Sequence, residues 1–187
     1  MSTPLNVVAL SGSTGRPSRT LVLTEAILEA LTRHVPVKSH VIDLGDIARE
    51  LGSALWRSDL PDEVEQQLRR IETADLLVVA TPVYRGSFPG HFKHLFDLIG
   101  QDALTDTPVL LAATGGSDRH ALVLDHQLRP LFSFFQALTL PIGVYASQGD
   151  FLDYRINSEA LSARIRLAAE RATALLGNSA RTLRQTA

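Results

Sequence analysis

The stretch "VVALSGSTGRPSRTLVLTEAILEAL", residues 7–31, runs from a strand pattern through a polar turn into an amphipathic helix pattern. Its first four residues are apolar, and from Ser18 onward apolar residues recur at helical spacing. The turn, residues 11–20, contains hydroxyl side chains, two glycines and two arginines. Because a helix start offers unpaired N–H groups and a positive dipole end, this turn predicts a site for a monophosphate. A plain N-cap by Ser18 is the alternative, although a cap requires neither the glycines nor the arginines.

Strand and helix patterns alternate along the rest of the chain. Nearly continuous apolar runs, typical of parallel strands covered on both faces, occupy residues 5–10, 74–81, 108–114 and 141–147. A fifth run, residues 35–44, alternates more and suits the edge of a sheet. Helical patterns cover residues 18–31, 61–73, 90–99, 120–138 and 158–176. The chain is therefore predicted to be α/β, a three-layer sandwich in which helices cover both faces of a five-stranded parallel sheet.

Two doubly wound folds fit this alternation, and the number of strands favours the flavodoxin-like order over the dinucleotide-binding Rossmann order. The first loop has neither the G-x-G-x-x-G spacing of the Rossmann fold nor the G-x-x-x-x-G-K-[ST] pattern of nucleotide hydrolases. The length of 187 residues suits one domain. We expect a single flavodoxin-like domain over residues 1–177, followed by a flexible tail over residues 178–187.

Composition excludes several classes of protein. The formal net charge of −2 argues against nucleic-acid binding. The absence of cysteine excludes disulfides, thiolate catalysis and cysteine-ligated metal centres. No signal-peptide pattern and no apolar run of membrane-spanning length are present. We therefore expect a cytoplasmic protein without a metal site, a membrane segment or a nucleic-acid partner.

Two further loops suit a flat ligand. "TPVYRGSFPGHFKHLFDLIG", residues 81–100, contains prolines and glycines that favour a preformed turn, with Tyr84 as an aromatic face. "TGGSDRH", residues 114–120, has paired glycines that permit close approach to a ring. Each loop alone is compatible with an ordinary connection. In a parallel sheet both meet the first loop beyond the carboxyl ends of the strands. A phosphate site beside a flat pocket predicts flavin mononucleotide (FMN).

The segments "SGSTGRPSRT", "TPVYRGSFPGHFKHLFDLI" and "ATGGS" together resemble the NAD(P)H-dependent FMN reductases of the flavodoxin-like fold. The likeness is greatest to the reductase components of alkanesulfonate and methanesulfonate two-component monooxygenase systems. It implies that the FMN phosphate is held by Ser13, Ser18, Arg19 and Thr20. It places the ribityl chain and ring along Pro82, Val83, Tyr84, Arg85 and Gly86. It places the edge of the ring at Thr114, Gly115 and Gly116.

One departure concerns the phosphate. Many relatives carry an arginine where this chain has Gly15. The resemblance therefore leaves two candidates, Arg16 and Arg19, to supply that charge.

The resemblance also implies an activity: hydride transfer from NADH or NADPH to free FMN, and delivery of the reduced flavin to a separate monooxygenase. Because the flavin carries that chemistry, no catalytic acid, base or nucleophile is assigned to the chain. Two other uses of the fold stay open, a quinone or azo-dye reductase that retains FMN and a flavodoxin-like electron carrier. The near-neutral charge counts against the carrier. The preferred nicotinamide and the sulfonate of the partner are also open.

The segment "HALVLDHQLRPLFSFFQAL", residues 120–138, is more apolar than a helix on one face of a sheet requires. One stripe consists of Leu124, Leu128, Leu131, Phe135 and Leu138. Further apolar residues lie off this stripe and, with the resemblance, favour a homodimer or homotetramer through this helix. Deep burial within one subunit is the alternative.

Pro130 interrupts the same helix. It has no N–H for the carbonyl of His126 and crowds that carbonyl, which predicts a kink or π-bulge near Asp125 and His126. The resemblance places an inserted residue of close relatives at His126. We expect His126 to mark a π-bulge that tunes assembly or flavin release.

Overall fold

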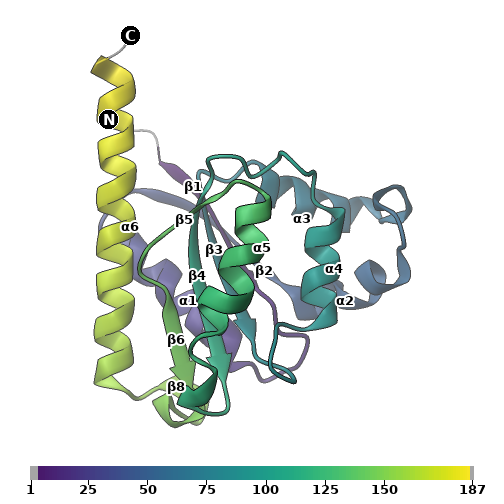
Figure 1. Cartoon of the computed structure of the whole chain (residues 1–187), viewed down its shortest axis with the longest axis horizontal. Helices are drawn as coiled ribbons and strands as arrows, with labels where there is room; N and C mark the ends of the chain where they lie inside the picture. Colours follow the sequence, from purple (N-terminus) through teal and green to yellow (C-terminus); the bar gives the residue numbers. More distant parts are fainter. Residues whose placement is uncertain (1–3, 186–187) are drawn as a thin grey trace.

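The structure, a computed structural model, describes residues 4–185, with side chains described for residues 4–176 (Figure 1). Its sheet has the order β2-β1-β3-β4, and two later strands, β5 and β6, both pair with β4. All of these pairings are parallel. The strands are β1 (Leu5–Ser11), β2 (Val37–Asp43), β3 (Leu76–Pro82), β4 (Pro108–Gly115), β5 (Leu138–Thr139) and β6 (Val144–Ser147). The flavodoxin-like prediction is confirmed, with one short strand more than expected.

Helices cover both faces of the sheet. One face carries α1 (Arg19–Thr32) and α6 (Glu159–Gln185). The other carries α2 (Leu44–Ser53), α3 (Asp62–Glu72), α4 (Gly90–Leu98) and α5 (Arg129–Phe134). Figure 1 shows α6 on one side of the strands and α4 and α5 on the opposite side. Short 3₁₀ turns occupy η1 (Arg57–Asp59), η2 (Asp118–His120) and η4 (Gln148–Asp150).

Strand β3 explains why the central runs are continuously apolar. Its side chains alternate between the two faces: Leu77 and Val79 enter the core under α2–α5, whereas Val78 enters the core under α1 and α6. All seven of its residues are buried. Because both faces are covered by helices, neither set of side chains meets water.

Several elements differ from the expectations. Helix α2 was missed, although Asp43 caps it by accepting the N–H of Gly45 at 3.2 Å. The helix expected over residues 120–138 ends at Phe134, since Gln136 adopts a positive φ of 55° and the chain turns back into β5. Leu138 therefore belongs to a strand and not to the predicted helical stripe. The strand expected over residues 141–147 begins only at Val144.

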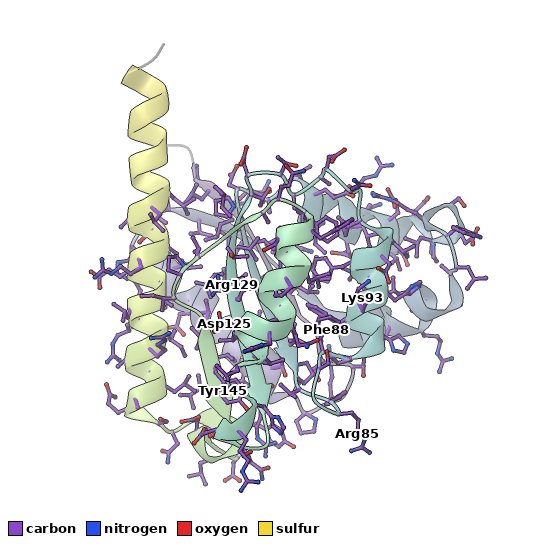
Figure 2. All side chains as sticks on the ribbon, in the orientation of Figure 1. Arg85, Phe88, Lys93, Asp125, Arg129 and Tyr145 are labelled. Atoms are coloured by element: carbon purple, nitrogen blue, oxygen red, sulfur yellow. The ribbon has the colours of Figure 1, made fainter. Side chains whose placement is uncertain are left out.

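The expected bulge is confirmed at η3 (Leu124–Leu128), which is a π-helical turn and contains His126. The N–H of Arg129 donates to the carbonyl of Leu124, five residues back, which is the hydrogen bond of a π-helical turn. Such a turn is a known response to a proline within a helix, because Pro130 has no N–H to donate to the preceding turn. Arg129 also pairs with Asp125 at 3.0 Å and donates to Thr139 Oγ1 at 2.9 Å, so it joins this turn to β5. Figure 2 labels Asp125 and Arg129 at this position.

The C-terminal helix is longer than its pattern indicated. Helix α6 reaches Gln185 and so enters the segment 178–187, whose side chains lie outside the described residues. The flexible tail and the single domain over residues 1–177 stay predictions. In the part of the chain that the structure describes, no helix combines the length and apolar character that a membrane span requires.

Arg57 fastens the loop after α2 to α3. Its guanidinium pairs with Glu65 at 2.9 Å and with Glu72 at 2.5 Å, and Glu72 also accepts the N–H of Gly100 at 2.9 Å. The hydrogen bond from Arg57 lowers the pKa of Glu65 from 4.5 to about 2, against the opposing effect of burial. Ionised Glu65 therefore stabilises the folded state.

We expect this contribution to disappear in acid. A carboxyl group whose pKa is lowered by folding stabilises the fold above its unfolded pKa, and this is lost as the pH falls through the folded pKa. For Glu65 the window runs from pH 4.5 down to about pH 2. The difference in unfolding free energy between the wild type and Glu65→Gln, measured by urea denaturation, should shrink between about pH 5 and about pH 3. A difference that stays constant over this range would contradict the assignment.

Candidate functional site

A cleft lies beyond the carboxyl ends of β1, β3 and β4, where a parallel sheet of this order places its ligands. Its volume is about 300 Å³, at the lower end of the range for small-molecule sites. It is lined by Ser13, Gly15, Arg16, Pro17, Ser18, Arg19, Thr20, Pro82, Val83, Tyr84, Thr114, Gly115, Gly116, Gln148 and Tyr154. The structure thus brings together every predicted site residue except Arg85 and Gly86.

The first loop forms one end of the cleft. Ser18 is the N-cap of α1, and its Oγ accepts the N–H of Leu21 at 3.1 Å. The N–H groups of Arg19 and Thr20 are the first of the helix and have no carbonyl one turn before them. Thr20 Oγ1 lies 2.7 Å from Thr114 Oγ1, which joins this loop to the end of β4. Ser18 therefore caps the helix without using the N–H groups that would meet a phosphate.

The two arginines of this loop have different surroundings. Arg16 pairs with Asp43 at 2.8 Å and with Asp46 at 2.6 Å, and the hydrogen bond to Asp43 raises its pKa. Arg19 forms no ion pair with any described residue, and its buried Nε has no hydrogen-bond partner among them. A buried guanidinium nitrogen without a partner fits an anionic ligand. Of the two candidates, Arg19 is therefore the one whose charge no described carboxylate offsets.

The second loop is a tight two-residue turn. Tyr84 and Ser87 exchange backbone hydrogen bonds of 2.8 and 3.2 Å, and between them Arg85 and Gly86 have positive φ values of 54° and 87°. This is the pattern of a type I′ turn. It keeps Tyr84 in the cleft, whereas the side chain of Arg85 points away from the body of the protein (Figure 2).

This turn is tied to the π-helical segment. Ser87 Oγ lies 2.9 Å from Gln127 Oε1, to which it donates a hydrogen bond. Gln127 belongs to η3, so the loop that carries Tyr84 is attached to the turn that Pro130 imposes.

The paired glycines of the third loop meet different surroundings. A Cβ on Gly115 would lie 2.1 Å from Tyr145 Oη, whereas a Cβ on Gly116 would have no atom within 4 Å. Tyr145 Oη donates to the carbonyl of Ser117 at 2.6 Å. Burial raises the pKa of Tyr145, and the charges of Asp118 and Asp150 raise it further, so the hydroxyl remains a donor. Gly115 is therefore required by packing, while Gly116 faces open space.

A hairpin that sequence reasoning missed forms the remaining wall. Strands β7 (Phe151–Leu152) and β8 (Arg155–Ile156) are antiparallel and are joined by Asp153 and Tyr154. Tyr154 enters the cleft from this turn, and Gln148 enters it from η4. The sequence gives little indication of this hairpin, because each strand is only two residues long and Asp-Tyr is not a typical pair for such a turn.

The chain is similar to known proteins in both sequence and structure. The sequence model of a family described as NADPH-dependent FMN reductase matches residues 5–151. The chain is 78% identical to the NADH-dependent FMN reductase SfnE of Pseudomonas putida, over 95% of each chain. It is 65% identical to an FMN reductase (NADPH) of Pseudomonas aeruginosa, over 98% of this chain and 99% of that one. An oxidoreductase structure from Corynebacterium diphtheriae superimposes with a TM-score of 0.85 at 34% identity, covering 95% of this chain and 99% of that chain.

Proposed function

The chain belongs to the NADPH-dependent FMN reductase family, and on that basis we propose that it transfers a hydride from NADH or NADPH to free FMN and releases the reduced flavin. The observation that carries this proposal is the cleft itself. At one end, Arg19 and the start of α1 suit a phosphate, and at the other Gly116 leaves space for a flat ring beside Tyr84. One relative is named for NADH and another for NADPH, so both donors enter the test.

In this proposal the chain binds and orients. When FMN is bound, the flavin supplies the redox chemistry. Arg19, together with the first N–H groups of α1, holds the phosphate end. The tight turn fixes Tyr84 beside the ring, and Gly116 leaves space for close approach of the backbone. No side chain is assigned as a proton donor or acceptor.

Release of the flavin is supported by how the charges are arranged. Arg16 lines the cleft, but its guanidinium is engaged by Asp43 and Asp46. Of the two arginines that line the cleft, Arg19 is therefore the one proposed to bind the phosphate. A single arginine at the phosphate suits a flavin that leaves after reduction. The proposed recipient is a separate flavin-dependent monooxygenase of the alkanesulfonate or methanesulfonate type, and the proposed location is the cytoplasm.

The test is oxidation of NADH and NADPH by the purified protein under anaerobic conditions, with and without excess FMN. The proposal requires saturable turnover that depends on added FMN, with reduced flavin recovered in a small-molecule filtrate. The faster donor identifies the nicotinamide specificity. A yellow protein that is reduced once and keeps its flavin would instead identify a retaining quinone or azo-dye reductase, or an electron carrier.

We also propose that the chain forms a homodimer or homotetramer through the segment 120–138. Three large apolar side chains there are strongly exposed, Leu122 and Phe134 at 62% and Leu138 at 53%. The buried residues of the same segment, such as Phe132, already fill the core of one subunit. Exposed large apolar side chains beside a filled core support contact with a second copy of the chain.

Phe134→Glu is expected to shift this protein to a smaller assembly, because it places a charge in the proposed apolar contact. The measurement is size-exclusion chromatography with light scattering. Leu55→Glu is the matched control, since Leu55 is 78% exposed and lies in the loop after α2. Equal masses for Phe134→Glu and the wild type would place the interface elsewhere.

The same assay with His126→Ala, combined with turnover, tests whether His126 tunes assembly or flavin release.

A further inference from the structure

Tyr154 has a backbone conformation that large side chains rarely adopt. Its φ is 58°, and the preceding residue of the turn, Asp153, has a φ of 47°. Glycine and asparagine take this left-handed region readily, whereas a bulky aromatic residue there is an outlier. Such outliers persist where the surrounding structure holds them, and they concentrate at ligand sites. The conformation of Tyr154 therefore indicates a role for its ring in the cleft.

The turn itself is held from both sides. Phe151 and Ile156, which begin and end the paired strands, pack against the core under α1 and α6. Before the hairpin, the Asp150 carboxylate accepts the N–H of Ser147 at 2.7 Å, and the Asp150 carbonyl accepts the N–H of Asn157 at 2.9 Å. The hairpin is thus fastened at its base, and Tyr154 is presented from its tip.

The ring of Tyr154 contacts Arg19. The Cζ atom of Arg19 lies over the ring, 4.9 Å from its centroid, within the range of a cation–π interaction. Both residues line the cleft. An aromatic ring has no carboxylate or carbonyl oxygen to accept hydrogen bonds, so this contact restrains the guanidinium without engaging its donors as an ion pair does.

A comparison with Arg16 shows what this restraint preserves. Arg16 is restrained by two carboxylates, which accept hydrogen bonds from its Nε and Nη2 and offset its charge. Arg19 is restrained by an uncharged ring and keeps its charge, while its buried Nε remains without a partner among the described residues. A cation restrained in this way is preorganised for an anion at the start of α1.

We infer that Tyr154 is a positioning residue whose ring holds the Arg19 guanidinium at the phosphate end of the cleft and thereby sets the affinity for a phosphate monoester. The inference rests on the proposed function, because it takes the phosphate monoester to be that of FMN. It adds a residue that does not follow from the loop motifs and that acts only through Arg19.

The test compares FMN with riboflavin, which has the same ring and ribityl chain but no phosphate. Tyr154→Leu is expected to raise the dissociation constant for FMN about fivefold, as loss of a cation–π contact predicts, and to leave that for riboflavin unchanged. Tyr154→Phe, which keeps the aromatic face, should restore the affinity for FMN. In the Arg19→Ala background, Tyr154→Leu should have no further effect.

A second measurement separates this role from a general structural one. Tyr154→Gly allows the positive φ without strain, so its thermal midpoint should not fall below that of the wild type, while its affinity for FMN should fall. If FMN and riboflavin weaken equally in Tyr154→Leu, the ring contacts the flavin directly and the inference is wrong. Unchanged FMN binding in that variant would also overturn it. Failure of the wild type to bind FMN would refute the proposed function itself, which is a distinct outcome.

Discussion

Arg19→Ala is expected to weaken FMN binding by roughly 10- to 150-fold, the equivalent of about 1.5–3 kcal/mol for a lost hydrogen-bonded charge, and to leave riboflavin binding nearly unchanged. The reason is that the charge of Arg16, the neighbouring cation, is offset by its ion pairs with Asp43 and Asp46, whereas Arg19 forms no ion pair with a described residue. The measurement is calorimetric titration of the variant with each flavin.

The control for this prediction removes the same charge from the other end of the same helix. Arg33→Ala deletes an exposed cation at the C-cap of α1, where its partner is Glu29. If long-range attraction between the protein and FMN governed affinity, both variants would weaken binding alike, and more at low ionic strength. A loss confined to Arg19→Ala would instead identify a direct contact with the phosphate.

Gly115→Ala is expected to destabilise the fold by about 1–3 kcal/mol, the usual cost of overpacking. The added Cβ would lie 2.1 Å from Tyr145 Oη, and neither side can yield easily. Gly115 is paired with Ser147 in the sheet, and Tyr145 is held by its hydrogen bond to Ser117. For a chain of this size, the thermal midpoint should fall by about 2–4 °C for each kcal/mol.

Two further variants test whether the contact with Tyr145 causes the loss of stability. Removing the hydroxyl in Gly115→Ala/Tyr145→Phe should recover much of the lost stability, because the next atom of the ring lies 3.1 Å from the new Cβ. Gly116→Ala is the matched control for stability, since its Cβ meets no atom within 4 Å. Equal destabilisation by both alanines would show that backbone freedom, and not the contact with Tyr145, is what the third loop requires.

The sequence predicted the sheet and most of the cleft because these depend on local patterns. A strand buried on both faces must be apolar throughout, as β3 is, and a phosphate loop must combine small residues with a helix start. The same local reasoning placed the bulge near His126, because Pro130 allows few alternatives in a helix.

The features that were missed depend on contacts between distant segments. Asp43, which determines that Arg16 is engaged, is 27 residues away in the sequence and reaches it only because β2 pairs with β1. Tyr154 lies on a turn of two positive φ values formed by residues that rarely adopt them, so no turn motif reveals it. The helix was predicted to continue to residue 138 because the apolar spacing extends to Leu138. There, pairing with β4 makes the chain a strand instead.

The hydrogen bond between Ser87 and Gln127 has a thermodynamic consequence. It joins a loop of the cleft to the segment 120–138, through which association is proposed, so the cleft and that segment are directly connected. Coupling between two sites is reciprocal in free energy. If the chain associates as proposed, the factor by which association changes flavin affinity through this bond equals the factor by which flavin changes association. Protein concentration and cofactor concentration would then be linked variables in any measurement of either equilibrium.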